Sequence, residues 1–153
     1  MNITLLYIKI FYEIFLSTIL FCGNEDFFLK VSILSENKNI NIFLCILFHL
    51  FGFSLACNIN IMIGFFIYKI SLKKNTLENK GIIFANFLYK NIELIFFFLI
   101  GFFPINSLLY VFLIFFGYSI SLLNYNQLLN FNKEKFFIYN IFLIIGKLIN
   151  ILI

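Results

Sequence analysis

The sequence predicts an all-α fold, namely a polytopic transmembrane bundle of about five helices. Three observations favour this class: 63% of the 153 residues are hydrophobic, only 12% are charged, and long apolar runs alternate with short polar clusters. Soluble domains contain about 45–50% apolar and about 25% charged residues. The mean hydropathy of the chain is +1.04. The composition therefore indicates an integral membrane protein.

Five apolar segments meet or approach the length of a membrane span. About 20 apolar residues are needed to cross a hydrocarbon core of about 30 Å. The predicted spans are residues 3–22, 40–70, 82–103, 108–123 and 136–153. The first is interpreted as a helix rather than a cleaved signal, because Lys9 and Glu13 interrupt it and no small-residue cleavage site follows. No linker or repeat divides the chain, so residues 1–153 are expected to form one transmembrane domain.

The second segment, 40–70, is longer than a perpendicular span requires. At 1.5 Å per residue it would extend about 46 Å. It must therefore tilt, protrude or break, and Asn58 and Asn60 mark the expected break. A single pass and a hairpin of two short helices both remain open, and the single pass fits the distribution of charges better.

The lysines predict the topology. With a single pass through 40–70, the lysine-bearing connections at 69–81 and 124–135 lie on one side of the membrane. The acidic segment 23–39 and the lysine-free turn at Pro104 lie on the other side. Lysine is enriched on the cytoplasmic side of membranes, so the N-terminus is expected to face the cytoplasm or matrix. This asymmetry also accounts for the net charge of +4, and no nucleic-acid partner is expected.

The residue usage is strongly biased. The chain has 25 Phe and no Trp, and all 11 basic residues are lysine. Phe, Ile, Lys, Asn and Tyr share A/T-rich codons, which is typical of organellar, endosymbiont and similar genomes. Without arginine, the chain cannot supply a bidentate carboxylate or phosphate clamp.

Cysteine and histidine give no sign of a metal or cofactor site. Cys22, Cys45 and Cys57 lie in or beside apolar runs with no CxxC spacing, so they are interpreted as packing residues. His49 is the only histidine, and a haem bound to it would need its second axial ligand from a partner chain. A hydrogen-bonded interior histidine is the favoured interpretation, and no metal or cofactor is expected.

Glu93 is the strongest candidate for a functional residue. Asn86, Tyr89, Lys90 and Glu93 follow i, i+3, i+4 and i+7 spacing, so they would form one polar stripe on the third helix. An ionisable group inside an apolar span is costly and usually functional. The stripe is therefore a candidate proton path, and its structural alternative is a helix end where Lys90 and Glu93 reach the interface. Glu13 repeats the pattern in the first span.

Two stretches resemble a known family. The apolar run 61–75, which contains Gly64 and ends in Lys73-Lys74-Asn75, is followed by Asn91-Ile92-Glu93-Leu94. This arrangement resembles the helix, basic turn and glutamate-bearing helix of subunit 4L of proton-pumping NADH:quinone oxidoreductase, and five spans in a short chain are similar to its subunit 6.

This resemblance implies a membrane subunit of a multi-subunit respiratory-chain complex, with a structural or proton-path role and no catalysis of its own. The expected partners are the lipid bilayer and other membrane subunits. The expected location is the mitochondrial inner membrane, with the inner membrane of an A+T-rich bacterium or endosymbiont as the alternative.

Two other classes remain open. Residues 79–84 resemble the Asn-x-Gly-x-x-Phe stretch of lipoprotein signal peptidases, but the required pair of aspartates is missing because Asp26 is the only aspartate. That resemblance implies at most an inactive relative. The other class is a stand-alone transporter or channel component.

Small residues rarely recur at four-residue spacing, so the sequence gives no indication of tight helix crossings.

A first prediction concerns the polar stripe. Replacing Glu93 with Gln removes the charge and keeps the shape, so coupled proton translocation should fall while assembly is retained. Proton pumping by membrane vesicles that carry the variant is the measurement. Unchanged pumping would remove the proposed role of Glu93.

Overall fold

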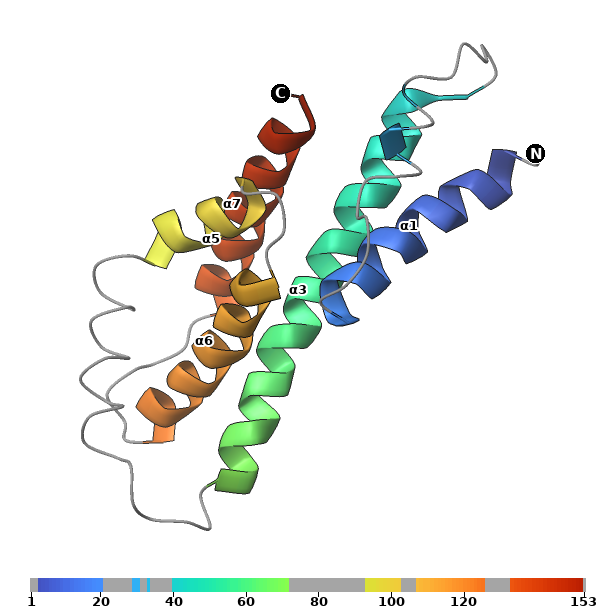
Figure 1. The fold of residues 1–153 in the computed structure, drawn as a ribbon. Coiled ribbons are helices and arrows are strands. Elements are labelled where there is room, and N and C mark those ends of the chain that lie inside the picture. Colours follow the sequence, from blue (N-terminus) through green and yellow to red (C-terminus); the bar gives the residue numbers. More distant parts are fainter. Residues whose placement is uncertain are drawn as a thin grey trace. The chain divides into compact units, whose positions relative to one another are not determined.

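The computed structural model describes residues 3–20, 29–30, 33, 40–71, 93–102, 107–125 and 133–152. Five helices run through them, labelled in Figure 1: α1 (Ile3–Leu20), α3 (Ile42–Ser71), α5 (Glu93–Phe102), α6 (Ser107–Tyr125) and α7 (Lys133–Leu152). The described ranges contain no β-strand. The all-α prediction is therefore confirmed for the part of the chain that the structure describes.

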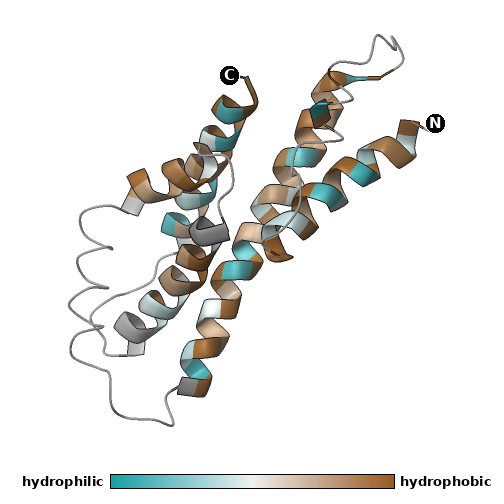
Figure 2. Cartoon of the chain, viewed as in Figure 1, coloured by the Kyte–Doolittle hydropathy of each residue, from teal (hydrophilic) through white to brown (hydrophobic). Residues whose placement is uncertain are grey.

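Three stretches are long and apolar enough to cross a membrane: Ile3–Leu20, Ile42–Ile70 and Glu134–Leu152. Figure 2 shows hydrophobic colour over much of these helices. A shorter apolar stretch, Val111–Ser121, lies within α6. In length and composition these helices are typical of a membrane protein.

The helix ends agree closely with most of the predicted spans. The predictions at 3–22, 108–123 and 136–153 correspond to α1, α6 and α7, with ends that differ by only a few residues. Of the predicted span 82–103, α5 covers Glu93–Phe102, and residues 82–92 lie outside the described residues.

α3 is one continuous helix of 30 residues, so a break at Asn58 and Asn60, one of the three outcomes that the length of 40–70 left open, is wrong. Asparagine disfavours a helix interior when its side chain competes for the backbone. In this helix the Asn58 side chain instead donates a hydrogen bond from Nδ2 to Oδ1 of Asn140 on α7, at 2.9 Å. Asn60 is fully buried. The bond from Asn58 to α7 directs its amide away from the backbone of α3, and the helix continues through both asparagines.

Asn41 determines where α3 begins. Its side-chain Oδ1 accepts a hydrogen bond from the backbone nitrogen of Leu44 at 3.3 Å, and its carbonyl accepts one from the backbone nitrogen of Cys45 at 3.1 Å. These bonds are those of an N-cap asparagine, which satisfies one of the unpaired N–H groups of the first turn.

The chain divides within α3 into two compact units, Met1–Cys57 (unit 1) and Asn58–Ile153 (unit 2). The single transmembrane domain expected for residues 1–153 stays a prediction. Each unit has its own packing.

In unit 1, aromatic rings join α1 to the first half of α3. The ring of Tyr7 stacks on Phe48 with centroids 5.7 Å apart, and Phe11 stacks on Phe51 at 5.8 Å. Gly52 allows this approach, because a Cβ there would lie 2.8 Å from the carbonyl oxygen of Phe11. Such offset stacks add to the burial of apolar surface.

In unit 2, α5 crosses α7 at a pair of glycines. A Cβ at Gly101 would lie 2.8 Å from the backbone nitrogen of Lys147 and would overlap the carbonyl oxygen of Leu143. A Cβ at Gly146 would lie 2.9 Å from the backbone nitrogen of Phe102. The two backbones therefore touch at Gly101 and Gly146, as small residues permit in membrane helices.

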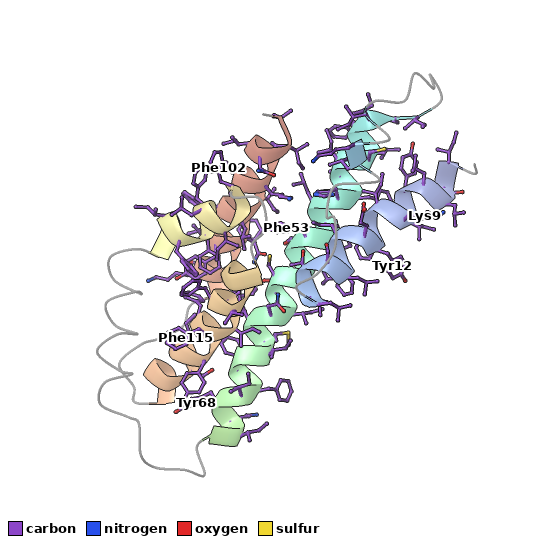
Figure 3. The ribbon with its side chains drawn as sticks, viewed as in Figure 1. Lys9, Tyr12, Phe53, Tyr68, Phe102 and Phe115 are labelled. Atoms are coloured by element: carbon purple, nitrogen blue, oxygen red, sulfur yellow. The ribbon has the colours of Figure 1, made fainter. Side chains whose placement is uncertain are left out.

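A second glycine pair lies where α3 crosses α6. A Cβ at Gly64 would lie 2.7 Å from the backbone nitrogen of Tyr118, and a Cβ at Gly117 would overlap the carbonyl oxygen of Ile61. Beside this crossing Tyr68, labelled in Figure 3, packs its ring edge-on against Tyr118 with centroids 5.4 Å apart.

The absence of tight crossings suggested by the sequence is therefore wrong for unit 2. Where α5 crosses α7, a glycine meets a glycine on the other helix, and where α3 crosses α6, each glycine meets the backbone of the other helix. Neither helix needs a repeat of small residues along its own sequence, so spacing within a helix could not reveal the contact.

An aromatic cluster fills the space between α5, α6 and α7. Phe97 stacks on Tyr139 with ring centroids 4.6 Å apart and planes within 7° of parallel. Phe116 meets Phe97 edge-on at 4.9 Å and Tyr139 edge-on at 5.9 Å. These side chains, contributed by three helices, form the buried core of unit 2.

The glycine crossing of α5 and α7 generates a prediction about stability. Gly146→Val would push its side chain into the backbone of α5, so the free energy of unfolding should fall by about 1–3 kcal/mol or more. Reversible unfolding in mixed micelles is the measurement. Ile145→Val, which places the same residue at the exposed neighbouring position, is the matched control and should change stability little. Equal losses for the two variants would contradict the crossing.

Candidate functional site

The residues singled out from the sequence are only partly described. Glu93 is the first residue of α5, and nothing is described of its side chain, while Asn86, Tyr89 and Lys90 lie outside the described residues. The polar stripe therefore stays a prediction. Glu13 is half-buried on α1 in unit 1.

His49 is fully buried on α3 in unit 1. Cys45 and Gly52, four residues before and three after it, are buried on the same face, as their spacing indicated. Cys57 is also buried. Among the described residues no three His, Cys, Asp or Glu side chains come together in a way that could hold a metal ion.

Lys147 is an ionisable residue that sequence analysis did not single out. It lies on α7, inside a stretch apolar enough to cross a membrane, and only 1% of its surface is exposed. The available signal was a lysine inside the apolar run 136–153. Lysine inside a span usually extends toward the interface, so its full burial could not be foreseen from the sequence.

The last turn of α5 crosses α7 at the position of Lys147. The last turn of α5 lies against the backbone of α7 at Gly146 and Lys147, because Gly101 has no side chain to hold it away. α5 ends at Phe102. The C-terminal end of a helix carries a partial negative charge. The crossing therefore brings the negative end of α5 to the part of α7 that holds this lysine.

Two asparagines join α3 to α7 in unit 2. Asn58 Nδ2 donates to Asn140 Oδ1 at 2.9 Å, and Asn140 Nδ2 donates to the carbonyl oxygen of Phe136 at 2.9 Å, one turn earlier on its own helix. Asn58 lies near the middle of α3, about 24 Å from the start of the helix at Ile42. The amide pair thus lies at the depth of the bilayer centre if α3 crosses the membrane.

A third asparagine closes the end of α5. Asn150 Nδ2 donates to the carbonyl oxygen of Phe102 at 2.8 Å, and the Phe102 side chain is labelled in Figure 3. The last carbonyls of a helix have no partner within it, so this bond satisfies one of them. Apolar surroundings make such a bond important, because no water competes for the carbonyl.

Asn140, Lys147 and Asn150 form what we call the α7 polar face. At 100° per residue their directions from the helix axis fall within about 80° of one another. The face carries amide groups and one amine, which can bind water, hold a proton or orient a polar ligand. The described residues of unit 2 contain two acidic residues, Glu93 and Glu134.

Comparisons with protein-family models, with curated proteins and with solved structures find no match for this chain.

The amide pair generates a prediction that a double-mutant cycle can test. Removing either side chain, by Asn58→Ala or Asn140→Ala, leaves a buried amide without its partner. The coupling free energy between the two should be about 0.6 kcal/mol, with about 1.7 kcal/mol as an upper bound for such bonds in membrane proteins. Reversible unfolding in mixed micelles gives the four stabilities.

The matched control for this cycle pairs Asn58→Ala with Asn150→Ala, since Asn150 bonds to Phe102 instead. The effects of mutations at separate sites are additive, so the coupling free energy between Asn58 and Asn150 should be zero. A zero coupling for Asn58 with Asn140 would contradict the hydrogen bond.

Proposed function

We propose that this chain is an integral membrane protein with about five spans, and that it serves as a membrane subunit of a proton-translocating respiratory assembly of the NADH:quinone oxidoreductase type. The observation that carries the proposal is the burial of Lys147 inside an apolar helix. Ionisable residues in membrane spans are rare because they are costly, and those that occur mark ion paths and proton relays.

The five spans of this proposal are the five helices. α1, α3 and α7 each contain a stretch long and apolar enough to cross a membrane. The 19 residues of α6 would extend about 28 Å, close to the thickness of the hydrocarbon core. α5, with residues 82–92 before it, would supply the remaining span.

A proton-path role fits the chemistry of Lys147 better than a purely structural role. A lysine amine binds and releases a proton, whereas an apolar residue of similar size would fill the same space without the desolvation penalty of a charge. The α7 polar face would supply hydrogen-bonding groups on either side of the amine.

Membership of a larger assembly is supported by the surface of the helices. Large aromatic side chains such as Phe43, Phe66 and Phe137 are about two-thirds exposed, at 67%, 65% and 68%. Such surface must be covered by lipid or by other membrane subunits. The stretches 61–75 and 91–94 supply the resemblance to respiratory subunits, and the mitochondrial inner membrane is the proposed location.

A stand-alone transporter or channel component is the second candidate. It is favoured by one observation: Lys147, the amide pair and the aromatic cluster all belong to unit 2 of the same chain. A polar path built from one chain would need no partner to complete it.

The proposal is tested with Lys147→Met and with Lys135→Met, a matched control because Lys135 is an exposed lysine on the same helix. A positioned proton-transfer group contributes roughly 10²–10⁴-fold, so Lys147→Met should lower proton translocation by at least about tenfold. Lys135→Met should leave it near the native rate. Membrane vesicles give the rate, and native electrophoresis after mild solubilisation gives the assembly state.

Migration of the native chain within a large oxidoreductase, together with loss of translocation in Lys147→Met, supports the proposal. A lone or dimeric species that still conducts protons favours the transporter instead. A normally assembled Lys147→Met variant with full translocation would overturn the proton-path role.

A further inference from the structure

The side-chain oxygen of Asn58, near the centre of α3, is buried without a hydrogen-bond donor. Asn58 donates from Nδ2 to Asn140, but its Oδ1 is buried and accepts no hydrogen bond. Buried polar atoms in folded proteins are almost always paired, and an exception usually marks an unplaced water or ligand. The exception is more significant at mid-bilayer depth, where no bulk solvent can supply the missing donor.

A second buried atom without a hydrogen bond belongs to α7. The hydroxyl of Tyr139 is buried and makes no hydrogen bond, although the residue is only 2% exposed and its ring is packed against Phe97 and Phe116. Tyr139 precedes Asn140 in the sequence. Asn58 on α3 and Tyr139 on α7, the sequence neighbour of Asn140, therefore each carry a polar atom whose hydrogen-bonding capacity the protein does not fill.

The chemistry of Asn58 Oδ1 and of the Tyr139 hydroxyl restricts which ligand can bind to them. An amide oxygen needs a donor, and a phenol hydroxyl can use either a donor or an acceptor. A divalent cation requires several oxygen ligands, usually including carboxylates, and among the described residues no such group is found. Water is both donor and acceptor and needs only two to four polar partners. Water is thus the occupant that the available groups suit.

We propose that unit 2 binds water in the bilayer interior at the Asn58–Asn140 pair. The water donates to Asn58 Oδ1, and the amide pair forms the floor of a hydrated site between α3 and α7. The inference rests on the proposed function, because it takes α3 to cross the membrane. The bound water extends that function, because it gives protons a route to the buried amine of Lys147.

The site is close enough to Lys147 to serve it. Asn140 and Lys147 are seven residues apart on one face, which corresponds to about 10 Å along the helix. Water oxygens in a hydrogen-bonded chain are about 2.8 Å apart, so two or three waters and the lysine side chain span this distance. Asparagine does not titrate. A proton would therefore pass from one water to the next and then to the amine, which returns it to water, with no net change in any group.

The test uses Ag⁺, a small ion that enters water but not hydrocarbon and that binds thiolates. Asn58→Cys and Met62→Cys are made in a chain whose native cysteines are replaced by alanine, and the sulfur introduced at position 58 replaces Oδ1 as an acceptor for the water. Met62 lies one turn after Asn58 on α3 and is 54% exposed on the outer surface, so it is the matched lipid-facing control. The protein stays in sealed membranes, and Ag⁺ protection against a maleimide added after denaturation is read by mass spectrometry.

The expected result is that Asn58→Cys is protected at least about tenfold faster than Met62→Cys, since only a hydrated thiol ionises. If neither cysteine is protected, the helix crosses lipid but the site is dry, and the water proposal is overturned while the proposed function stands. If both are protected, or Met62→Cys alone, α3 does not cross the membrane as proposed, and both proposals fall.

A second pair keeps the test decisive if the α3 variants do not assemble. Asn140→Cys and Ile141→Cys place the thiol on α7, with Ile141 exposed as the lipid-facing control. Protection of Asn140→Cys without protection of Ile141→Cys supports the hydrated site. Equal, slow reaction at both positions overturns it.

Discussion

The contact of backbone on backbone at the glycine pairs is the constraint on which unit 2 depends. Gly101 with Gly146, and Gly64 with Gly117, bring α5 onto α7 and α3 onto α6 more closely than any side chain would allow. In lipid, helices gain little from the hydrophobic effect when they associate, so close van der Waals packing must hold them. The aromatic cluster of Phe97, Phe116 and Tyr139 then fills the space beside these crossings.

The same closeness determines the polar chemistry of unit 2. Because α5 lies directly against α7, its last carbonyl reaches Asn150 and its negative end approaches Lys147. Asn58 reaches Asn140 across α3 and α7. Each polar group that membrane-spanning helices bury needs a hydrogen-bond partner from the protein or from bound water, because hydrocarbon offers none. Packing and polar pairing are therefore linked, and a change in one crossing would alter the other.

Composition and hydropathy were sufficient for the class of the fold and for the positions of most helices. Apolar run lengths are local properties of the chain, so α1, α6 and α7 could be placed from the sequence to within a few residues. The local rule failed at Asn58 and Asn60. A side-chain amide can break a helix or bond to a neighbouring helix, and only the presence of Asn140 decides between these outcomes.

By itself the sequence determined that the chain is helical and suited to a membrane, because both follow from the content and order of its residues. Tertiary structure alone decided that α3 continues unbroken, that single glycines on different helices meet, and that Lys147 is buried rather than extended to the interface. These depend on which residues of other helices lie opposite, and no spacing within one helix contains that information.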